Sequence, residues 1–82
     1  MYYHSKYIVI EQGLGTPVPI VFSQLLVHDD VARALGGKVI GAGFCQIEGN
    51  QYICYGESTS CRIKSRLKED AEILNRLLGT EP

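Results

Sequence analysis

Cys45 and Cys54 are the residues whose type and spacing most directly suggest chemistry. They stand symmetrically about Gly49-Asn50 in the stretch GFCQIEGNQYICYG, residues 43–56. A Gly-Asn pair between two apolar runs predicts a two-residue hairpin, and glycine in the first position favours a type II′ turn. This hairpin pairs Cys45 with Cys54 at a position without ladder hydrogen bonds, where Cα atoms lie ~4.5 Å apart. The two thiols are therefore expected to be close neighbours.

A close pair of thiols can form a disulfide, belong to a metal site, or simply fill space in a core. A disulfide would close only a short loop, in a chain that shows no export signal. A zinc site needs further ligands. Cys61 lies at odd spacing from Cys54 and so points to the other face of a continued strand, while His4 and His28 are distant in sequence. We expect two reduced, buried cysteines and no metal site.

The segment GESTSCRIKSR, residues 56–66, holds the second group of polar residues. It leads from a strand into the start of a helix, where free N–H groups and the helix dipole attract anions. The candidate anion-binding residues are Ser58, Thr59, Ser60, Arg62, Lys64, Ser65 and Arg66. An ordinary solvated surface is the alternative, because alternation along a strand turns Arg62 and Lys64 toward water. Acidic residues also follow directly, at Glu69 and Asp70. Both interpretations stay open.

His28, Asp29 and Asp30 form a third group, which suggests acid–base chemistry. The start of a helix explains the two aspartates equally well, because the helix dipole favours negative charge there. A nucleophile, a base and an orienting group cannot be assembled from the sequence. We therefore expect no catalytic residues and no cofactor, and a protein that is not an enzyme.

The elements that would position these residues follow the order ββαββα. Strands are predicted over 6–12, 18–24, 38–48 and 51–60, and helices over 28–37 and 65–79. Pro19 has no N–H to give to a ladder, which places the second strand at a sheet edge or Pro19 at the start of the strand. Ser65 is expected to cap the second helix. The pattern predicts one α+β domain, residues 1–82, with a four-stranded, mainly antiparallel sheet.

Both faces of the predicted sheet are apolar. Alternation puts Gly41, Gly43 and Gly56 on the face of the two cysteines, and a face this thin lets a helix approach closely. The candidate partner surface on the opposite face consists of Ile40, Phe44, Ile53 and Tyr55. Two short helices hardly cover both faces, so this second face is expected to meet a partner or a second copy, unless loops and tyrosines cover it.

Composition limits the partners further. Hydrophobic residues are 45% and charged residues 21%, a balance typical of a folded domain. The net charge of −1 gives no global attraction for nucleic acid or a membrane surface. The first residues, MYYHSKYIVIEQ, lack an apolar leader, and no stretch approaches the ~20 apolar residues of a membrane span. We expect a cytoplasmic protein.

The stretches PIVF, HDDVARALGGKVIGAGFC and YGESTS…IKSR…DA resemble a family of small uncharacterised proteins of tailed bacteriophages and prophages. The resemblance covers roughly residues 18 to 78. It implies a bacterial host cell and action by binding, for instance inhibition of a host enzyme or of a defence system. It implies no catalytic or binding residues.

Two functions are expected from these observations. The first is a small non-enzymatic accessory protein that acts by protein–protein binding, as a homodimer and on a host protein. The alternative is a protein that sequesters a nucleotide or another phosphate-bearing small molecule at the corner between Ser58 and Arg66. Nucleic-acid binding is a weaker third expectation, supported only by the short basic cluster.

Overall fold

The computed structural model describes residues 5–11, 13, 15–58 and 63–78, and it confirms a small α+β fold. The helices and strands, in chain order, are β1 (Ser5–Glu11), β2 (Pro17–Phe22), α1 (His28–Leu35), β3 (Lys38–Glu48), β4 (Gln51–Tyr55), β5 (Glu57–Ser58), β6 (Ile63–Lys64) and α2 (Leu67–Leu78). Both helices are slightly shorter than the sequence predicts. The first ends where Gly36 takes a positive φ of 72° and its N–H bonds to the Ala32 carbonyl.

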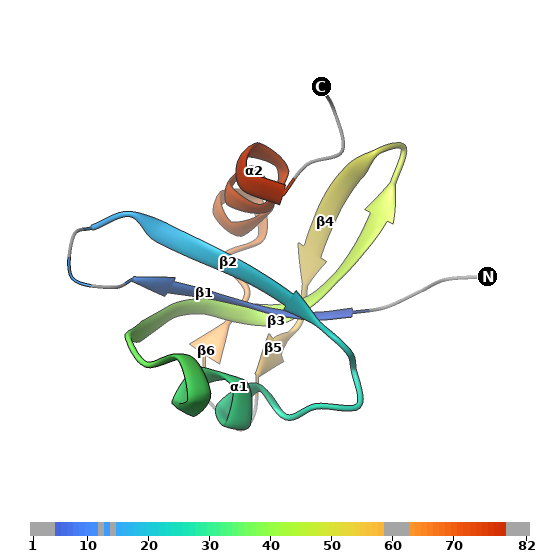
Figure 1. Cartoon of the computed structure of the whole chain (residues 1–82). Helices are drawn as coiled ribbons and strands as arrows, with labels where there is room; N and C mark the ends of the chain where they lie inside the picture. The colour runs from blue at the N-terminus through green and yellow to red at the C-terminus, as the bar shows by residue number, and fades with distance from the viewer. Residues whose placement is uncertain (1–4, 12, 14, 59–62, 79–82) are drawn as a thin grey trace.

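The main sheet has the strand order β2-β1-β3-β4, and every neighbouring pair is antiparallel (Figure 1). The central position of β1 follows from its sequence, because the apolar run from Tyr7 to Ile10 can be buried on both faces. Pro19 lies in β2 at the edge of the sheet, as its missing N–H predicts.

The hairpin between β3 and β4 has the predicted register, with Glu48 opposite Gln51 and Cys45 opposite Cys54. Its turn type differs from the prediction. Gly49 and Asn50 both have positive φ, of 57° and 68°, a pattern that belongs to a type I′ turn rather than to type II′. Asparagine tolerates this backbone conformation, and both turn types contain two residues, so the register is the same.

The predicted strand 51–60 is wrong in one respect, because it breaks at Gly56. This glycine has a φ of 75°, which turns the chain out of the sheet. The two residues of β5 then pair with β6 in a separate small sheet, with Glu57 opposite Lys64 and Ser58 opposite Ile63. Sequence patterning missed β6 because two residues are too short to show a period.

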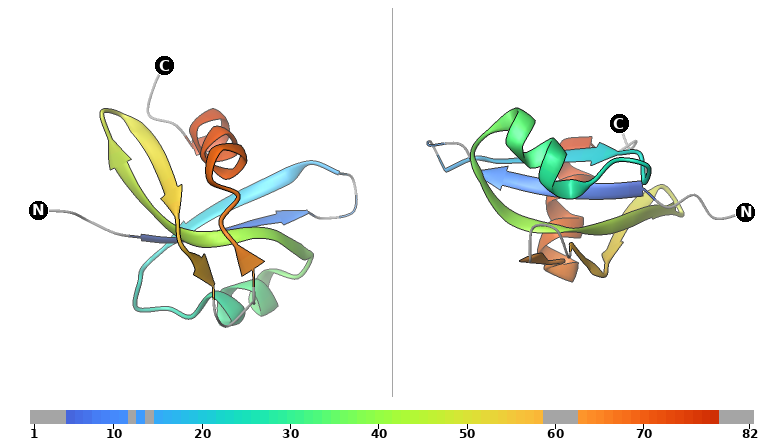
Figure 2. Two further views of the ribbon diagram at one scale, coloured as in Figure 1. Left: turned by 180° about the vertical axis from the view of Figure 1, so that it is seen from behind. Right: turned by 90° about the horizontal axis from the view of Figure 1, so that it is seen from below.

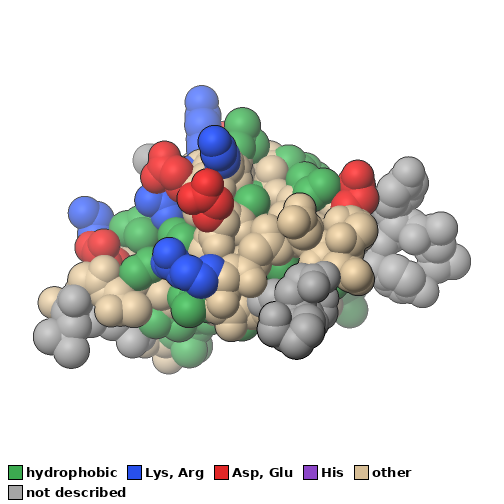
Figure 3. Space-filling model, turned by 90° about the horizontal axis from the view of Figure 1, so that it is seen from above, with side chains coloured by type: hydrophobic (Ala, Val, Ile, Leu, Met, Phe, Trp, Pro, Cys, Tyr) green, Lys and Arg blue, Asp and Glu red, His purple; other side chains and the backbone are tan. Residues whose placement is uncertain are grey.

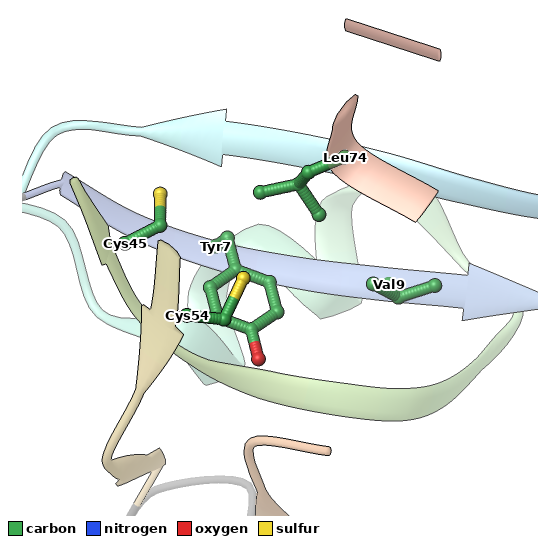
Figure 4. Packing of buried hydrophobic residues seen from close by; sticks show 5 residues of the cluster. All are labelled: Tyr7, Val9, Cys45, Cys54 and Leu74. Carbon is green, nitrogen blue, oxygen red and sulfur yellow. The ribbon is translucent and has the colours of Figure 1, made fainter. Parts of the chain in front are cut away.

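Each face of the main sheet has its own core cluster, and α2 and α1 lie on opposite sides of the sheet (Figures 1 and 2). On the α2 side the buried cluster consists of Tyr7, Val9, Cys45, Cys54 and Leu74 (Figure 4). On the other side it consists of Ile8, Ile10 and Ala42, against which residues of α1 and Ile63 of β6 pack. The second face is therefore covered in part by α1 and β6.

A β-bulge corrects the predicted position of Ile40. Val9 pairs with Gly41, but Ile10 pairs with Val39, so β3 carries one extra residue at this point. The extra residue shifts the alternation by one, and every side chain before it changes face. Ile40 therefore packs against the cluster on the α2 side, and not on the face of Phe44.

The thin face predicted from the glycines is confirmed at two of the three positions. A Cβ atom at Gly41 would overlap the carboxylate of Asp70, and one at Gly43 would lie 3.2 Å from the Ser65 Cβ. Gly56 is different, because a Cβ there would meet the ring of Phe44 at 3.0 Å. Gly41 and Gly43 thus let the start of α2 approach the sheet.

Within the described part of the chain, neither helix combines the length and the hydropathy that crossing a membrane requires.

Substitution of Gly41 tests this close approach. Gly41→Ala places a methyl group against a buried carboxylate, so we expect unfolding free energy to fall by about 3 kcal/mol. Urea unfolding of the Gly41→Ala, Asp70→Ala and doubly substituted proteins measures the coupling. In the double variant the methyl group has space, so its added cost is expected to be much smaller. Equal cost in both backgrounds would contradict the close approach.

Candidate functional site

The most distinctive polar cluster surrounds Asp70, in the first turn of α2. Asp70 is fully buried, yet its carboxylate lies directly over Gly41 of β3. An isolated buried carboxylate is strongly destabilising, so it must be paired and hydrogen-bonded. Tyr7 and Arg66 supply these partners, and Ser65 is bonded to the Tyr7 hydroxyl in turn. We call Asp70, Tyr7, Ser65 and Arg66 the Asp70 network.

Tyr7 connects the Asp70 network to the central strand. Its hydroxyl lies 2.6 Å from Asp70 Oδ2 and 2.6 Å from Ser65 Oγ. Because a carboxylate without a proton can only accept, the Tyr7 hydroxyl donates to Asp70, and the Ser65 hydroxyl is free to donate to Tyr7. Burial, reinforced by the hydrogen bond to Asp70, raises the pKa of Tyr7 well above its ordinary value.

Arg66 binds the same carboxylate from two directions. Its backbone N–H donates to Asp70 Oδ2 at 2.9 Å, and its side-chain Nε donates to Oδ1 at 2.8 Å. Nη2 lies 2.8 Å from Oδ1, close enough for an ion pair but not aligned for a hydrogen bond. Arg66 also makes a longer contact of 3.4 Å with the exposed Glu69. Its guanidinium charge is therefore neutralised within the chain.

This geometry decides what the predicted anion-binding corner contains. Arg66 and Ser65 both belong to the Asp70 network, so the anion at this helix start is a carboxylate of the chain itself. Ser65 is not the N-cap of α2 as predicted, because the helix begins at Leu67 and the residue directly before it is Arg66. Ser58 is buried in β5, and Lys64 is exposed on β6. The other three candidates, Thr59, Ser60 and Arg62, lie outside the described residues.

The electrostatics of the surrounding surface are mixed. Acidic and basic side chains lie next to one another on the side of the molecule that carries α2 (Figure 3). The described residues on this side therefore present no extended basic strip for a phosphate backbone.

His28, the other candidate for chemistry, is buried on the opposite face of the sheet. Its Nε2 lies 2.7 Å from the Gly43 carbonyl, so Nε2 carries the proton and donates. The rings of Phe22 and Phe44 meet the imidazole edge-on, at centroid distances of 5.5 and 5.8 Å. Burial lowers the pKa of His28, although the bond to Gly43 acts in the opposite direction. The ring is enclosed rather than presented to a substrate.

Asp29 and Asp30 occupy the first turn of α1, as the helix-start interpretation predicts. Asp29 pairs with Arg33, one turn further along, at 2.9 Å. The His28 imidazole instead contacts the Gly43 carbonyl and the rings of Phe22 and Phe44. The start of α1 therefore accounts for the positions of the two aspartates.

Cys45 and Cys54 are free thiols in the core beside Tyr7, with side chains on the α2 side of the sheet (Figure 4). Burial raises the pKa of Cys45 to about 12 and that of Cys54 to about 11. Both thiols are consequently protonated at neutral pH and weakly nucleophilic. Within residues 5–11, 13, 15–58 and 63–78, no three His, Cys, Asp or Glu side chains lie close enough together to hold a metal ion.

The predicted partner surface is smaller in the structure than in the sequence. Ile40 lies on the α2 side of the sheet, because the β-bulge in β3 shifts the alternation there. Phe44 and Tyr55 stack on each other, with centroids 6.1 Å apart, and both are half-buried. Ile53, with 39% of its surface exposed, is the member that stays most open to solvent.

A more exposed apolar surface, which the sequence did not predict, lies between β2 and α1. Leu25, Leu26 and Val27 follow one another between β2 and α1, with exposed fractions of 90%, 50% and 44%. We call these three residues the apolar tip. The signal was present in the sequence as the run LLV before the helix start, but a run of three does not reveal whether it is buried.

Comparisons of the chain with protein-family models, with curated proteins and with solved structures found no match.

Breaking the Asp70 network tests its role in stability. Asp70→Asn leaves the Arg66 guanidinium without its buried partner, and we expect a loss on the order of 3 kcal/mol. Tyr7→Phe removes one hydrogen-bond donor from the carboxylate, and we expect the unfolding free energy to fall by about 1–3 kcal/mol. Glu69→Gln is the matched control, because it makes the same chemical change at an exposed pair worth under about 1 kcal/mol. Equal losses for Asp70→Asn and Glu69→Gln in urea unfolding would argue against the network.

The buried His28 predicts a pH dependence. The unfolded chain binds a proton at this residue near pH 6.5, whereas the folded chain resists it because the pKa is lowered. The stability contributed by neutral His28 is therefore present above about pH 6.5 and lost as the pH falls below it. In unfolding measurements at pH 7.5, 6.5 and 5.5, His28→Gln should show a smaller fall than the parent protein. The same slope in both proteins would show that His28 does not titrate differently on folding.

Proposed function

We propose that this protein acts by binding another protein through the apolar tip. The observation that carries the proposal is three consecutive apolar side chains, exposed together on a segment whose backbone is fixed. Single exposed leucines are common on protein surfaces, but a contiguous exposed apolar patch is typical of an interaction site. Burying a leucine side chain in an interface removes it from water, which favours binding by about 1.5–3 kcal/mol.

Five hydrogen bonds fix the backbone of the apolar tip. Ser23 accepts from Leu25 N–H with its hydroxyl at 3.1 Å and from Leu26 N–H with its carbonyl at 3.0 Å. Lys6 of β1 donates to the Leu26 carbonyl at 2.6 Å, and the Val27 carbonyl accepts from the first turn of α1. A surface that is already ordered loses less conformational entropy when it binds, which favours affinity.

The remaining expectations about function agree with a binding role and stay predictions. The resemblance to small phage proteins implies action by binding to a host protein, and the apolar sheet surface was the reason to expect a second copy. A tip that enters an apolar pocket would serve either partner. The interpretation as a non-enzymatic protein likewise stays a prediction. The alternative, capture of a phosphate-bearing small molecule, has lost two of its expected contacts to the Asp70 network, and no contact among the described residues favours it.

A photo-crosslinking amino acid tests the apolar tip directly. We would place it at position 25 and, as a matched control, at position 68, which is exposed on α2. The purified chain at rising concentration tests pairing of two copies, and an extract of the native cell tests a different partner. We expect an adduct at position 25 that exceeds the yield at position 68. The absence of such an adduct in both arms would contradict the proposal.

A second substitution shows whether the adduct is specific. Leu26→Asp places a charge in the middle of the apolar tip and should abolish the adduct formed at position 25. Because the Leu26 side chain is half-exposed, the unfolding free energy of the protein is expected to change by no more than about 0.5 kcal/mol. An adduct that persists in the folded Leu26→Asp protein would come from nonspecific contact.

A further inference from the structure

Of the two edges of the four-stranded sheet, the outer edge of β4 is the one whose backbone donors are not interrupted by proline. At the opposite edge, β2 contains Pro17 and Pro19, and neither can donate to an added strand. β4 has the sequence QYICY, with an N–H at every residue. A strand edge with free donors and acceptors is a template for pairing with another chain.

The hairpin register shows which groups of β4 face this edge. In a two-residue hairpin the pair next to the turn, Glu48 and Gln51, exchanges ladder hydrogen bonds, and the following pairs alternate. Tyr52 and Cys54 therefore occupy positions without ladder bonds to β3. Their backbone N–H and C=O groups point away from β3, toward the outer edge.

Asn75 of α2 occupies this edge at Tyr52. Its Oδ1 accepts from the Tyr52 N–H at 2.6 Å, and its Nδ2 donates to the Tyr52 carbonyl at 3.2 Å. One carboxamide thus presents the same donor and acceptor that a neighbouring strand would present. The adjacent Leu74 is fully buried against the sheet, which holds this part of α2 in place.

We propose that Asn75 is an internal competitor that keeps the β4 edge closed to β4 of a second copy. The partner is argued from the chain itself: proline removes donors from β2, which leaves β4 as the edge that can pair with its own counterpart. Two β4 strands related by a two-fold axis at Ile53 would place Tyr52 opposite Cys54 of the other copy. In that register the outward groups of both residues find partners. The exposed Ile53 side chains would meet at the axis.

This surface is separate from the apolar tip, so both can be tested independently. All comparisons use a Leu25→Asp background, in which the apolar tip cannot contribute to association. In this background the protein should be monomeric by analytical ultracentrifugation. Asn75→Ala should make amide exchange at Tyr52 at least about tenfold faster, as the loss of two hydrogen bonds implies. It should also produce a concentration-dependent dimer.

Three further variants make the test specific. Arg76→Ala is the matched control, because Arg76 is exposed on the same helix and should change neither exchange nor association. Asn75→Asp keeps the acceptor for Tyr52 N–H but loses the donor, so its exchange should be intermediate, which keeps the test decisive if Asn75→Ala does not fold. Ile53→Lys added to Asn75→Ala should abolish the dimer, because like charges would face each other at the axis.

The opposite results are equally clear. Unchanged exchange at Tyr52 in Asn75→Ala would show that Asn75 does not close the edge. Fast exchange in a protein that stays monomeric up to the highest concentration would show that the open edge does not bind a second copy. A dimer that survives Ile53→Lys would place the association elsewhere. Each result overturns the proposal, and none bears on the apolar tip.

Discussion

The fold depends on one buried ion, the carboxylate of Asp70. Because an unpaired carboxylate cannot be tolerated in this core, its partners must all be in place together. Tyr7 comes from the central strand, Arg66 from the segment before the last helix, and the space comes from the absent side chain of Gly41. The requirement fixes the position of α2 on the sheet more narrowly than apolar packing alone would do, since apolar contacts are not directional.

Gly43 extends this constraint to the other face. Its missing side chain leaves space for Ser65 and Tyr7 on the α2 side, while its carbonyl accepts a hydrogen bond from His28 at the start of α1. The two helices therefore take their positions from the same residue of β3. The segment that leads into α1 is in turn held by Lys6 of β1. The exposed leucines before α1 are thus carried by a rigid support, which is what a binding surface requires.

The sequence predicts whatever depends on local rules. The two helices and the four strands of the main sheet, the edge position of Pro19 and the pairing of Cys45 with Cys54 follow from periodicity, missing donors and turn length, and these are confirmed. The separate small sheet of β5 and β6 was not predicted. The predicted face of Ile40 was wrong, because the sequence pattern does not reveal the single extra residue of a bulge. The pairing of Tyr7 with Asp70 was missed for a different reason. Those residues are 63 apart, and no period links them. Only Gly41 and Gly43 indicated in the sequence that a helix approaches the sheet closely.

The same separation has a consequence for how the chain folds. β1 lies in the middle of the sheet and is described near the start of the chain, whereas α2 is the last described element. During synthesis, the hydroxyl of Tyr7 obtains its acceptor only after the 63-residue stretch to Asp70 has been made. Closing so long a loop has a large entropic cost before the contact forms. On a ribosome, the sheet would therefore form only an incomplete intermediate, with one face exposed to solvent, until α2 emerged and docked.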